Sequence, residues 1–195
     1  SRADIDRYIP ILKKISQEKI FQPIMFLSSF HKPNQFGYHL YEINKLKIKI
    51  IENNFNKKLN DTYISKVDHY CFDMKNFNKV MIKIKPSLIV LLGDRFEIVS
   101  AAMPAVLQDI PIVHFYGGSV TEGAIDDKIR HAITKLSNIH LVLNKKYFDR
   151  VTSFKIFLKV LSSFFASFLL KPIPIFALLS PAGNNQKYPG FTSLR

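Results

Sequence analysis

The sequence has almost no cysteine: Cys71 is the single thiol among 195 residues. One thiol cannot form an internal disulfide, and no group of Cys and His residues has the spacing of zinc ligands. These absences argue against a disulfide-stapled secreted scaffold and against a structural zinc module, and we expect no metal site. A reducing, cytoplasmic setting is therefore expected.

Acidic residues are missing from the last part of the chain. Residues 152–195 contain four lysines, one arginine and no Asp or Glu, whereas the whole chain has 28 Lys and Arg against 15 Asp and Glu, a net charge of +13. This change in composition predicts a boundary near residue 151. The lysines are scattered among many Ile, Asn and Phe, as A/T-rich coding sequence favours, and do not form arginine clusters interleaved with aromatics. Nucleic-acid binding is therefore not expected, and a non-catalytic basic module that binds acidic surfaces or nucleic acid is kept as the alternative.

The chain also lacks a clean apolar run of membrane-spanning length. The best candidate, Phe154–Leu170, contains two lysines and is followed by Pro172 and Pro174, whereas a span needs roughly 20 apolar residues. We therefore expect no transmembrane helix. The chain opens on Ser1 rather than Met, so its true start is expected to lie further upstream.

Short apolar runs alternate with helical patterns along most of the chain. Pro10 is placed early enough to be tolerated in the first turn of the first expected helix. Strands that alternate with helices of ten or more residues specify an α/β fold, a parallel sheet with helices on both faces. The pattern predicts helices near residues 4–18, 36–46, 64–85, 96–108 and 125–137, and strands near 24–28, 47–51, 88–92, 111–115 and 139–143.

One of these helices carries a regular apolar stripe. Ile64, Val67, Cys71, Met74 and Met81 recur every three or four residues or a multiple of that spacing, which predicts that they share one face and pack into the core. We accordingly expect Cys71 to be a small core residue.

Residues able to do chemistry follow two of the expected strands. Gly93-Asp94-Arg95 comes after the strand at 88–92, and the loop Tyr116–Glu122 comes after the strand at 111–115. Ligands of such sheets bind in the crevice outside the carboxyl ends of the strands, so neighbouring strands would bring both segments to one crevice. A lone Gly-Asp-Arg also fits a strand cap with a surface ion pair.

The helix expected after this loop contains two acid–base pairs. Asp126 with Arg130, and Asp127 with His131, are spaced i, i+4, so each acid can meet a base on its own face. Acids in a first turn also suit the helix dipole. Taken alone, such a helix also fits a solvated surface that pairs with itself.

Two long strings carry a resemblance to a known family. They are LIVLLGDRFEIVSAA, residues 88–102, and GGSVTEGAIDDKIRHAITKLSNIHLV, residues 117–142. Together they closely resemble the hydrolysing UDP-N-acetylglucosamine 2-epimerases of sialic and legionaminic acid-type biosynthesis. Ser1-Arg2-Ala3-Asp4 looks like the end of that family's first loop, and residues 30–43 match more weakly. The resemblance covers about residues 1–151.

The resemblance implies a fold and a reaction. The family has two Rossmann-like domains that face each other across a cleft, the glycosyltransferase-B arrangement, and this chain would be an N-terminal fragment without its first strand. A base removes the C2 proton of the sugar while UDP departs, which gives a 2-acetamidoglucal. Water then adds to yield N-acetylmannosamine and UDP. The resemblance implies a UDP-sugar substrate, no cofactor and a homo-oligomer for the complete protein.

The resemblance also implies roles for individual residues. Tyr116 and Ser119 depart from the family pattern, because many members carry an acid or a histidine at these two places, so Glu122 is the candidate for the second acid. For His114 a packed, hydrogen-bonded core histidine is the alternative to a ligand. The catalytic candidates are Asp94, Glu122 and Asp126; the candidates for substrate binding are Arg2, Arg95, His114, Tyr116, Gly117, Gly118, Arg130 and His131.

After Val151 the match stops. Residues 152–195 show neither the family's next strand nor its second domain, so the chain is expected to bind UDP-sugar poorly and to turn over little. A shifted reading frame or a truncated gene model explains such a tail, and a genuine membrane or partner-binding tail is the alternative. Translation of the underlying DNA in the other two frames discriminates between them.

Overall fold

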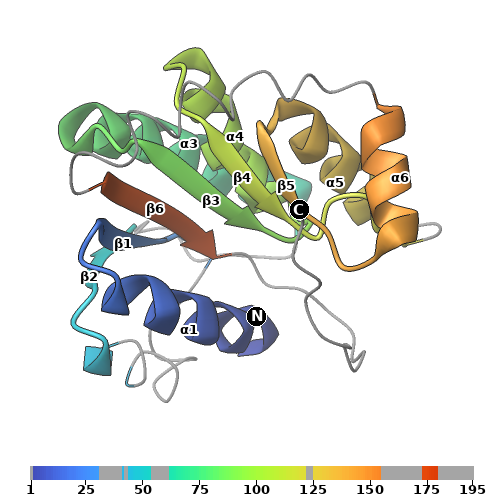
Figure 1. Ribbon diagram of the computed structural model, residues 1–195. Helices are drawn as coiled ribbons and strands as arrows, with labels where there is room; N and C mark the ends of the chain where they lie inside the picture. Colours follow the sequence, from blue (N-terminus) through green and yellow to red (C-terminus); the bar gives the residue numbers. More distant parts are fainter. Residues whose placement is uncertain are drawn as a thin grey trace.

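The computed structural model describes residues 2–30, 41, 44–53, 62–121, 125–154 and 173–179, with the backbone alone described for 2–7 and 173–179. Six strands form one sheet in the order β2-β1-β6-β3-β4-β5, and every neighbouring pair is parallel (Figure 1). The expected parallel α/β sheet is confirmed. The strands are β1 (Phe21–Leu27), β2 (Lys49–Glu52), β3 (Leu88–Leu92), β4 (Ile112–Phe115), β5 (Ile139–Leu141) and β6 (Ile173–Leu179).

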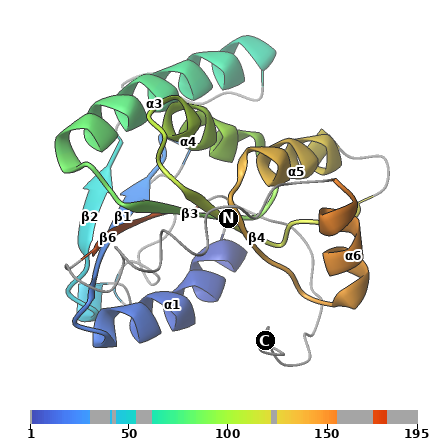
Figure 2. The same cartoon turned by 45° about the horizontal axis from the view of Figure 1, so that its top comes forward.

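Helices cover both faces of the sheet (Figure 2). Helix α1 packs on one face with Tyr8 and Leu12, and α3, α4 and α5 cover the other. Alternate residues of β3 enter the two cores: Leu88, Val90 and Leu92 face α1, and Ile89 and Leu91 face the other helices. Such continuous apolar strands are typical of a sheet buried on both faces. The helices are α1 (Arg2–Gln17), α3 (Tyr63–Ile84), α4 (Phe96–Leu107), α5 (Ile125–Leu136) and α6 (Lys145–Ser153).

The expected elements agree closely with these bounds from β3 to β5. Pro10 lies in the interior of α1 and not in its first turn, because the helix begins at Arg2. Most of the helix expected at 36–46 lies outside the described residues. Within the stretch expected as a tail, residues 173–179 form β6 at the centre of the sheet. None of the helices in the described part combines the length and apolarity that crossing a bilayer requires.

The apolar stripe expected on α3 is wrong for its first part, whereas Met81 is buried as expected. Ile64 is 78% exposed, Val67 is 59% exposed and Cys71 is exposed. The buried face of α3 consists of His69, Asp73, Phe77 and Met81. Two polar residues are buried there because α3 hydrogen-bonds to the ends of β1 and β2.

Candidate functional site

The loops after β3 and β4 lie at one edge of the sheet. Leu92 pairs with Phe115, and the Gly93 N–H donates to the Phe115 carbonyl oxygen at 3.3 Å. The chain therefore leaves both strands side by side at their carboxyl ends. The expectation that Asp94 and the glycine pair share one edge is confirmed.

Arg130 of α5 holds the centre of this edge. Its side chain is 5% exposed, and its guanidinium forms an ion pair with Asp94, whose side chain is 16% exposed. The same group donates to Asp127 Oδ1 at 3.3 Å and to Thr121 Oγ1 at 3.0 Å. Because the Thr121 N–H also donates to Asp127, at 3.0 Å, one buried cation joins the loop after β3, the loop after β4 and the start of α5.

The expected pairing of acids and bases on α5 is partly wrong. Arg130 pairs with Asp127 at i+3 and with the distant Asp94, in place of Asp126. The expected pair of Asp127 and His131 is confirmed at 3.5 Å. The i, i+4 spacing predicted partners for Arg130 within α5 but not Asp94, which follows β3. A buried guanidinium forms hydrogen bonds with the carboxylates that the fold places around it.

Asp126 faces the same group of charges. Burial raises its pKa, the Asp94 carboxylate raises it further, and the Arg95 and Arg130 charges oppose the rise. A carboxyl group with a raised pKa holds a proton at higher pH than usual, which suits proton transfer.

His114 lies beneath the edge. Its side chain is fully buried, Nε2 is 2.8 Å from the Gly93 carbonyl oxygen and Nδ1 is 3.2 Å from Thr134 Oγ1. Burial lowers its pKa to about 4, so the ring is neutral near pH 7. Since a carbonyl oxygen only accepts, Nε2 carries the proton and donates it to Gly93. The packed alternative is the arrangement observed, and His114 supports the residue before Asp94.

The glycine pair forms a tight turn against α6. Tyr116 and Gly118 have φ angles of 67° and 77°, in the left-handed region that suits glycine. Arg150 Nη1 donates to the Gly118 carbonyl oxygen at 2.5 Å. Sequence analysis missed Arg150, since nothing in the local pattern links it to a turn 32 residues away.

Of the other expected site residues, the structure describes the side chains of Arg95, Tyr116 and His131. Arg95 lies 3.4 Å from the buried carboxyl of Glu97, Tyr116 packs on the core and the His131 ring meets the Phe154 ring edge-on. Arg2 begins α1, but its side chain is not described, and Glu122 lies outside the described residues.

A second buried polar cluster lies at the ends of β1 and β2, and sequence analysis missed it. Asp73 Oδ1 accepts the Ser29 N–H at 2.8 Å and Asn53 Nδ2 at 2.5 Å. His69 Nδ1 is 3.0 Å from Ser29 Oγ. Burial raises the pKa of Asp73 to about 6; the hydrogen bonds from Ser29 and Asn53 oppose this rise, and the Glu97 carboxyl adds to it.

Replacement of Asp73 by Asn is expected to stabilise the fold at pH 7.5 by about 1–2 kcal/mol. The folded chain holds the Asp73 proton up to about pH 6, whereas the unfolded chain releases it near the usual 3.8. Stability from this group is therefore greatest below about pH 4 and falls as the pH rises through 6. An amide keeps the acceptor oxygen for Ser29 and Asn53 and carries no charge.

Urea unfolding from pH 4 to 7.5 measures this effect. In the Asp73→Asn chain, the free energy of unfolding should no longer fall between pH 4 and 6 through ionisation of Asp73. Asp149→Asn is the control, because Asp149 is exposed. A loss of stability in Asp73→Asn at pH 7.5 would mean that the carboxylate charge is needed.

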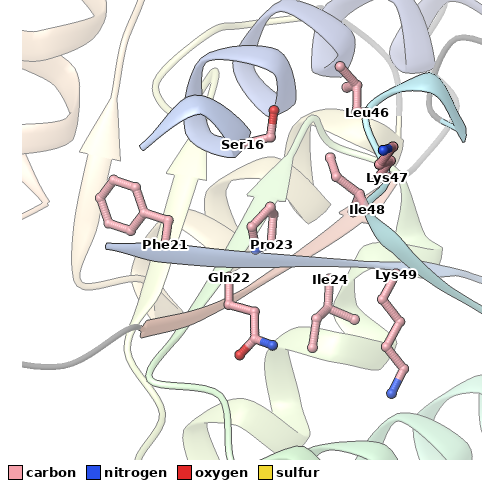
Figure 3. Close-up of a pocket in the computed structure, with 9 residues that line it drawn as sticks. All are labelled: Ser16, Phe21, Gln22, Pro23, Ile24, Leu46, Lys47, Ile48 and Lys49. Carbon is pink, nitrogen blue, oxygen red and sulfur yellow. The ribbon is translucent and has the colours of Figure 1, made fainter. Parts of the chain in front are cut away.

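A small cavity lies at the opposite edge. It measures about 230 Å³ and is bounded by the end of α1, the start of β1 and the segment before β2. Figure 3 shows its lining side chains on both sides of β1, with Gln22, Ile24 and Lys49 on one side and Ser16 and Leu46 on the other. These groups do not converge, and ligands of parallel sheets bind at the carboxyl edge. In the described part of the chain, no three His, Cys, Asp or Glu residues are arranged to hold a metal ion.

Comparisons with known proteins match this chain over most of its length. The family described as UDP-N-acetylglucosamine 2-epimerase matches residues 13–157. The GDP/UDP-N,N'-diacetylbacillosamine 2-epimerase (hydrolyzing) of Campylobacter jejuni is 35% identical over 71% of this chain and 36% of its own length. The UDP-N,N'-diacetylbacillosamine 2-epimerase (hydrolyzing) of Legionella pneumophila is 30% identical over 73% of this chain and 37% of its own.

Solved structures agree with the fold. The crystal structure of UDP-GlcNAc 2-epimerase from Neisseria meningitidis bound to UDP-GlcNAc aligns with a TM-score of 0.67 at 15% identity, over 81% of this chain and 42% of that one. The chain thus spans less than half the length of the relatives it matches.

Proposed function

The chain belongs to the UDP-N-acetylglucosamine 2-epimerase family, and from this membership we propose that residues 1–151 form the sugar-side half of a hydrolysing 2-epimerase. Its substrate is a UDP-linked 2-acetamido sugar. The single observation that supports this most is the carboxyl edge of the sheet, where Arg130 binds Asp94 and Asp126 faces both.

The reaction requires proton transfer at C2 and loss of UDP from C1. In the proposed first step the C2–H and C1–O bonds break, the double bond of a 2-acetamidoglucal forms, and UDP leaves with the C1–O electron pair. Water then adds across the double bond and returns a proton to C2, which gives N-acetylmannosamine. The protein must therefore supply a group that takes and returns a proton, and cations that oppose the charge on the pyrophosphate.

The geometry divides these roles among the site residues. Asp94, bound to the Arg130 cation, is suited to accept hydrogen bonds from sugar hydroxyls or a proton from carbon. Asp126, with its raised pKa, is suited to hold and return a proton. We propose Glu122 as the second acid, since Tyr116 and Ser119 are not acids, and Arg2 and Arg95 as cations toward the pyrophosphate. Replacement of Glu122 by Gln in a complete homologue with this loop tests the first of these roles, since unchanged turnover would exclude it.

The setting and the remaining partners belong to the same proposal. We place the protein in the cytoplasm, as its single cysteine suggests, in a sialic or legionaminic acid-type pathway, with the complete protein a homo-oligomer. The names of the Campylobacter and Legionella relatives make a diacetamido sugar a second substrate to test beside UDP-N-acetylglucosamine.

Saturation-transfer NMR with millimolar UDP-N-acetylglucosamine tests the proposal on the chain itself. We expect weak binding in which hexose protons receive more saturation than uridine protons, because the described site is on the sugar side. Asp94→Asn should reduce the hexose signal about fivefold or more, by loss of a charge-assisted hydrogen bond. Asp149→Asn on α6 should leave it unchanged, since Asp149 pairs with Lys145 at 3.0 Å on the surface. Equal signals in all three proteins would contradict the site.

A further inference from the structure

The buried polar cluster at the ends of β1 and β2 has no part in the proposed chemistry, yet it fixes a segment of the same sheet edge. Ser28, Ser29 and Phe30 follow β1 at its carboxyl end, and Asp94 follows β3 at its carboxyl end. Both strands are parallel to the one strand between them. Residues 28–30 and the candidate sugar site therefore lie at one edge of the sheet.

Asp73 of α3 fixes the backbone of this segment. Its Oδ1 accepts the Ser29 N–H at 2.8 Å and Asn53 Nδ2 at 2.5 Å. Asn53 is held in turn, because its Oδ1 accepts Asn76 Nδ2 at 2.7 Å. A buried network of this kind favours one arrangement of the groups that it joins, since a group that loses its partner stays unsatisfied away from water.

His69, one turn earlier on α3, holds the side chains of the same segment. Its Nδ1 lies 3.0 Å from Ser29 Oγ, and the centre of its ring lies 5.3 Å from the centre of the Phe30 ring. His69 is 1% exposed and Asp73 is 0% exposed, so neither can touch a ligand at the edge. Both must act on the site through Ser29 and Phe30.

Phe30 connects this cluster to the segment that carries Asp94. Its ring meets the Phe96 ring edge-on, with 5.2 Å between the two centres, and Phe96 begins α4 two residues after Asp94. The next residue of α4, Glu97, faces the cluster, since its carboxyl group adds to the rise in the pKa of Asp73. Phe30 and Phe96 are each only partly buried, so aromatic surface remains accessible next to the Asp94 carboxylate.

We propose that Asp73 and His69 are positioning residues for the candidate sugar site. They hold Ser29 so that the Phe30 ring stays against α4 and forms an aromatic wall for the hexose. This inference rests on the proposed function, in which Asp94 binds the sugar. Binding sites combine apolar and aromatic walls with a few placed polar groups, and a hexose presents C–H groups on its faces beside its hydroxyls. Phe30 packs on the C–H face, and Asp94 accepts a hydrogen bond from a hydroxyl.

Asp73→Ala and Asp73→Asn test the anchor without a ligand. Alanine removes the acceptor, so we expect amide hydrogen exchange at Ser29 to become about tenfold faster and the nuclear Overhauser contacts between the Phe30 and Phe96 rings to weaken. Asparagine keeps an acceptor oxygen and should preserve both. Phe77→Leu is the matched control, because Phe77 is buried one turn further along α3 and packs on a ring of β1. It should loosen the core and leave Ser29 protected.

Saturation-transfer NMR with UDP-N-acetylglucosamine tests the wall. Asp73→Ala and Phe30→Leu should each raise the Kd for the sugar nucleotide about fivefold, because the aromatic contact with the hexose is lost. Asp73→Asn and Phe77→Leu should bind like the unchanged chain. If Asp73→Ala does not fold, Phe30→Leu still decides, since it leaves the hydrogen bonds of Asp73 in place.

The outcomes separate this proposal from the proposed function. No binding by the unchanged chain would contradict the proposed function and the wall with it, whereas faster exchange at Ser29 in Asp73→Ala would still support the anchor. Unchanged exchange at Ser29 in that variant would overturn the anchor, and unchanged binding by Phe30→Leu would overturn the wall. Equal loss of binding in Phe77→Leu would also overturn the proposal, because general loosening of α3 would then explain the effect.

Discussion

Replacement of Gly118 by Ala is expected to destabilise the chain by about 2–5 kcal/mol. A Cβ on Gly118 would lie 2.5 Å from the Tyr147 carbonyl oxygen and 2.9 Å from Val151 Cγ2, so α6 would have to move as a body. Overlap of this kind costs about 1–3 kcal/mol, and a side chain at a φ of 77° adds roughly 1–2 kcal/mol. Movement of α6 would also break the hydrogen bond from Arg150 to Gly118. Urea unfolding followed by circular dichroism measures the loss.

Gly93→Ala is the matched control for this prediction. Gly93 also has a positive φ, 99°, but the nearest atom to an added Cβ is Ile98 Cδ1 at 3.8 Å. It should therefore show the backbone cost alone, roughly 1–2 kcal/mol. The difference between the two variants measures the contact between the glycine turn and α6. Equal losses would show that α6 does not press on the turn.

Replacement of Arg130 by Met is expected to cost about 3–5 kcal/mol, the range for breaking a buried ion pair from one side. The Arg130 side chain is 5% exposed and that of Asp94 is 16% exposed, so Asp94 would keep a charge in a mostly buried place without its ion-pair partner. Thr121 and Asp127 would lose hydrogen bonds as well. We expect the same variant to lose binding of UDP-N-acetylglucosamine, because the loops after β3 and β4 are no longer tied together.

Two further variants serve as controls for the Arg130→Met prediction. The double variant Arg130→Met with Asp94→Asn should recover part of the stability, since no isolated charge then remains at position 94. Lys145→Met breaks an exposed pair whose side chains are 86% and 56% exposed, and such pairs contribute at most about 1 kcal/mol. An Arg130→Met chain within 1 kcal/mol of the unchanged protein would mean that water reaches the Asp94 carboxylate.

The pattern of apolar residues predicted helices and strands well where apolar residues alone are buried. The run Leu88–Leu92 is a strand as expected, because an unbroken apolar stretch fits a strand covered on both faces. The same reasoning failed on α3, where Ile64 and Cys71 are exposed and Asp73 is buried. Hydrogen bonds from Ser29 and Asn53 reverse the expected order of burial, and no pattern within one helix reports them.

The candidate site was predictable in its place and less so in its contacts. Parallel strands bring their carboxyl ends to one edge, so Asp94 and the turn at Gly117 and Gly118 could be placed together from the sequence. The partner of Arg130 could not be predicted in this way. Asp94 lies 36 residues away, and i, i+4 spacing predicts only pairs within one helix. From the sequence, His114 fitted either a ligand-binding residue or a packed core residue. Its complete burial shows that it is a core residue.

The order of short apolar runs and helical stripes by itself determined that this chain forms a parallel α/β sheet, and the two long motifs determined its family. Those properties depend on side-chain periodicity and on residues close together in the sequence, which can be read without coordinates. The tertiary structure alone decided which acid binds Arg130, that Arg150 supports the glycine turn, and that residues 173–179 lie between β1 and β3. Each of these is a contact between segments that are distant in the sequence. The free energy of such a contact depends on burial and geometry, and both arise only when the chain folds.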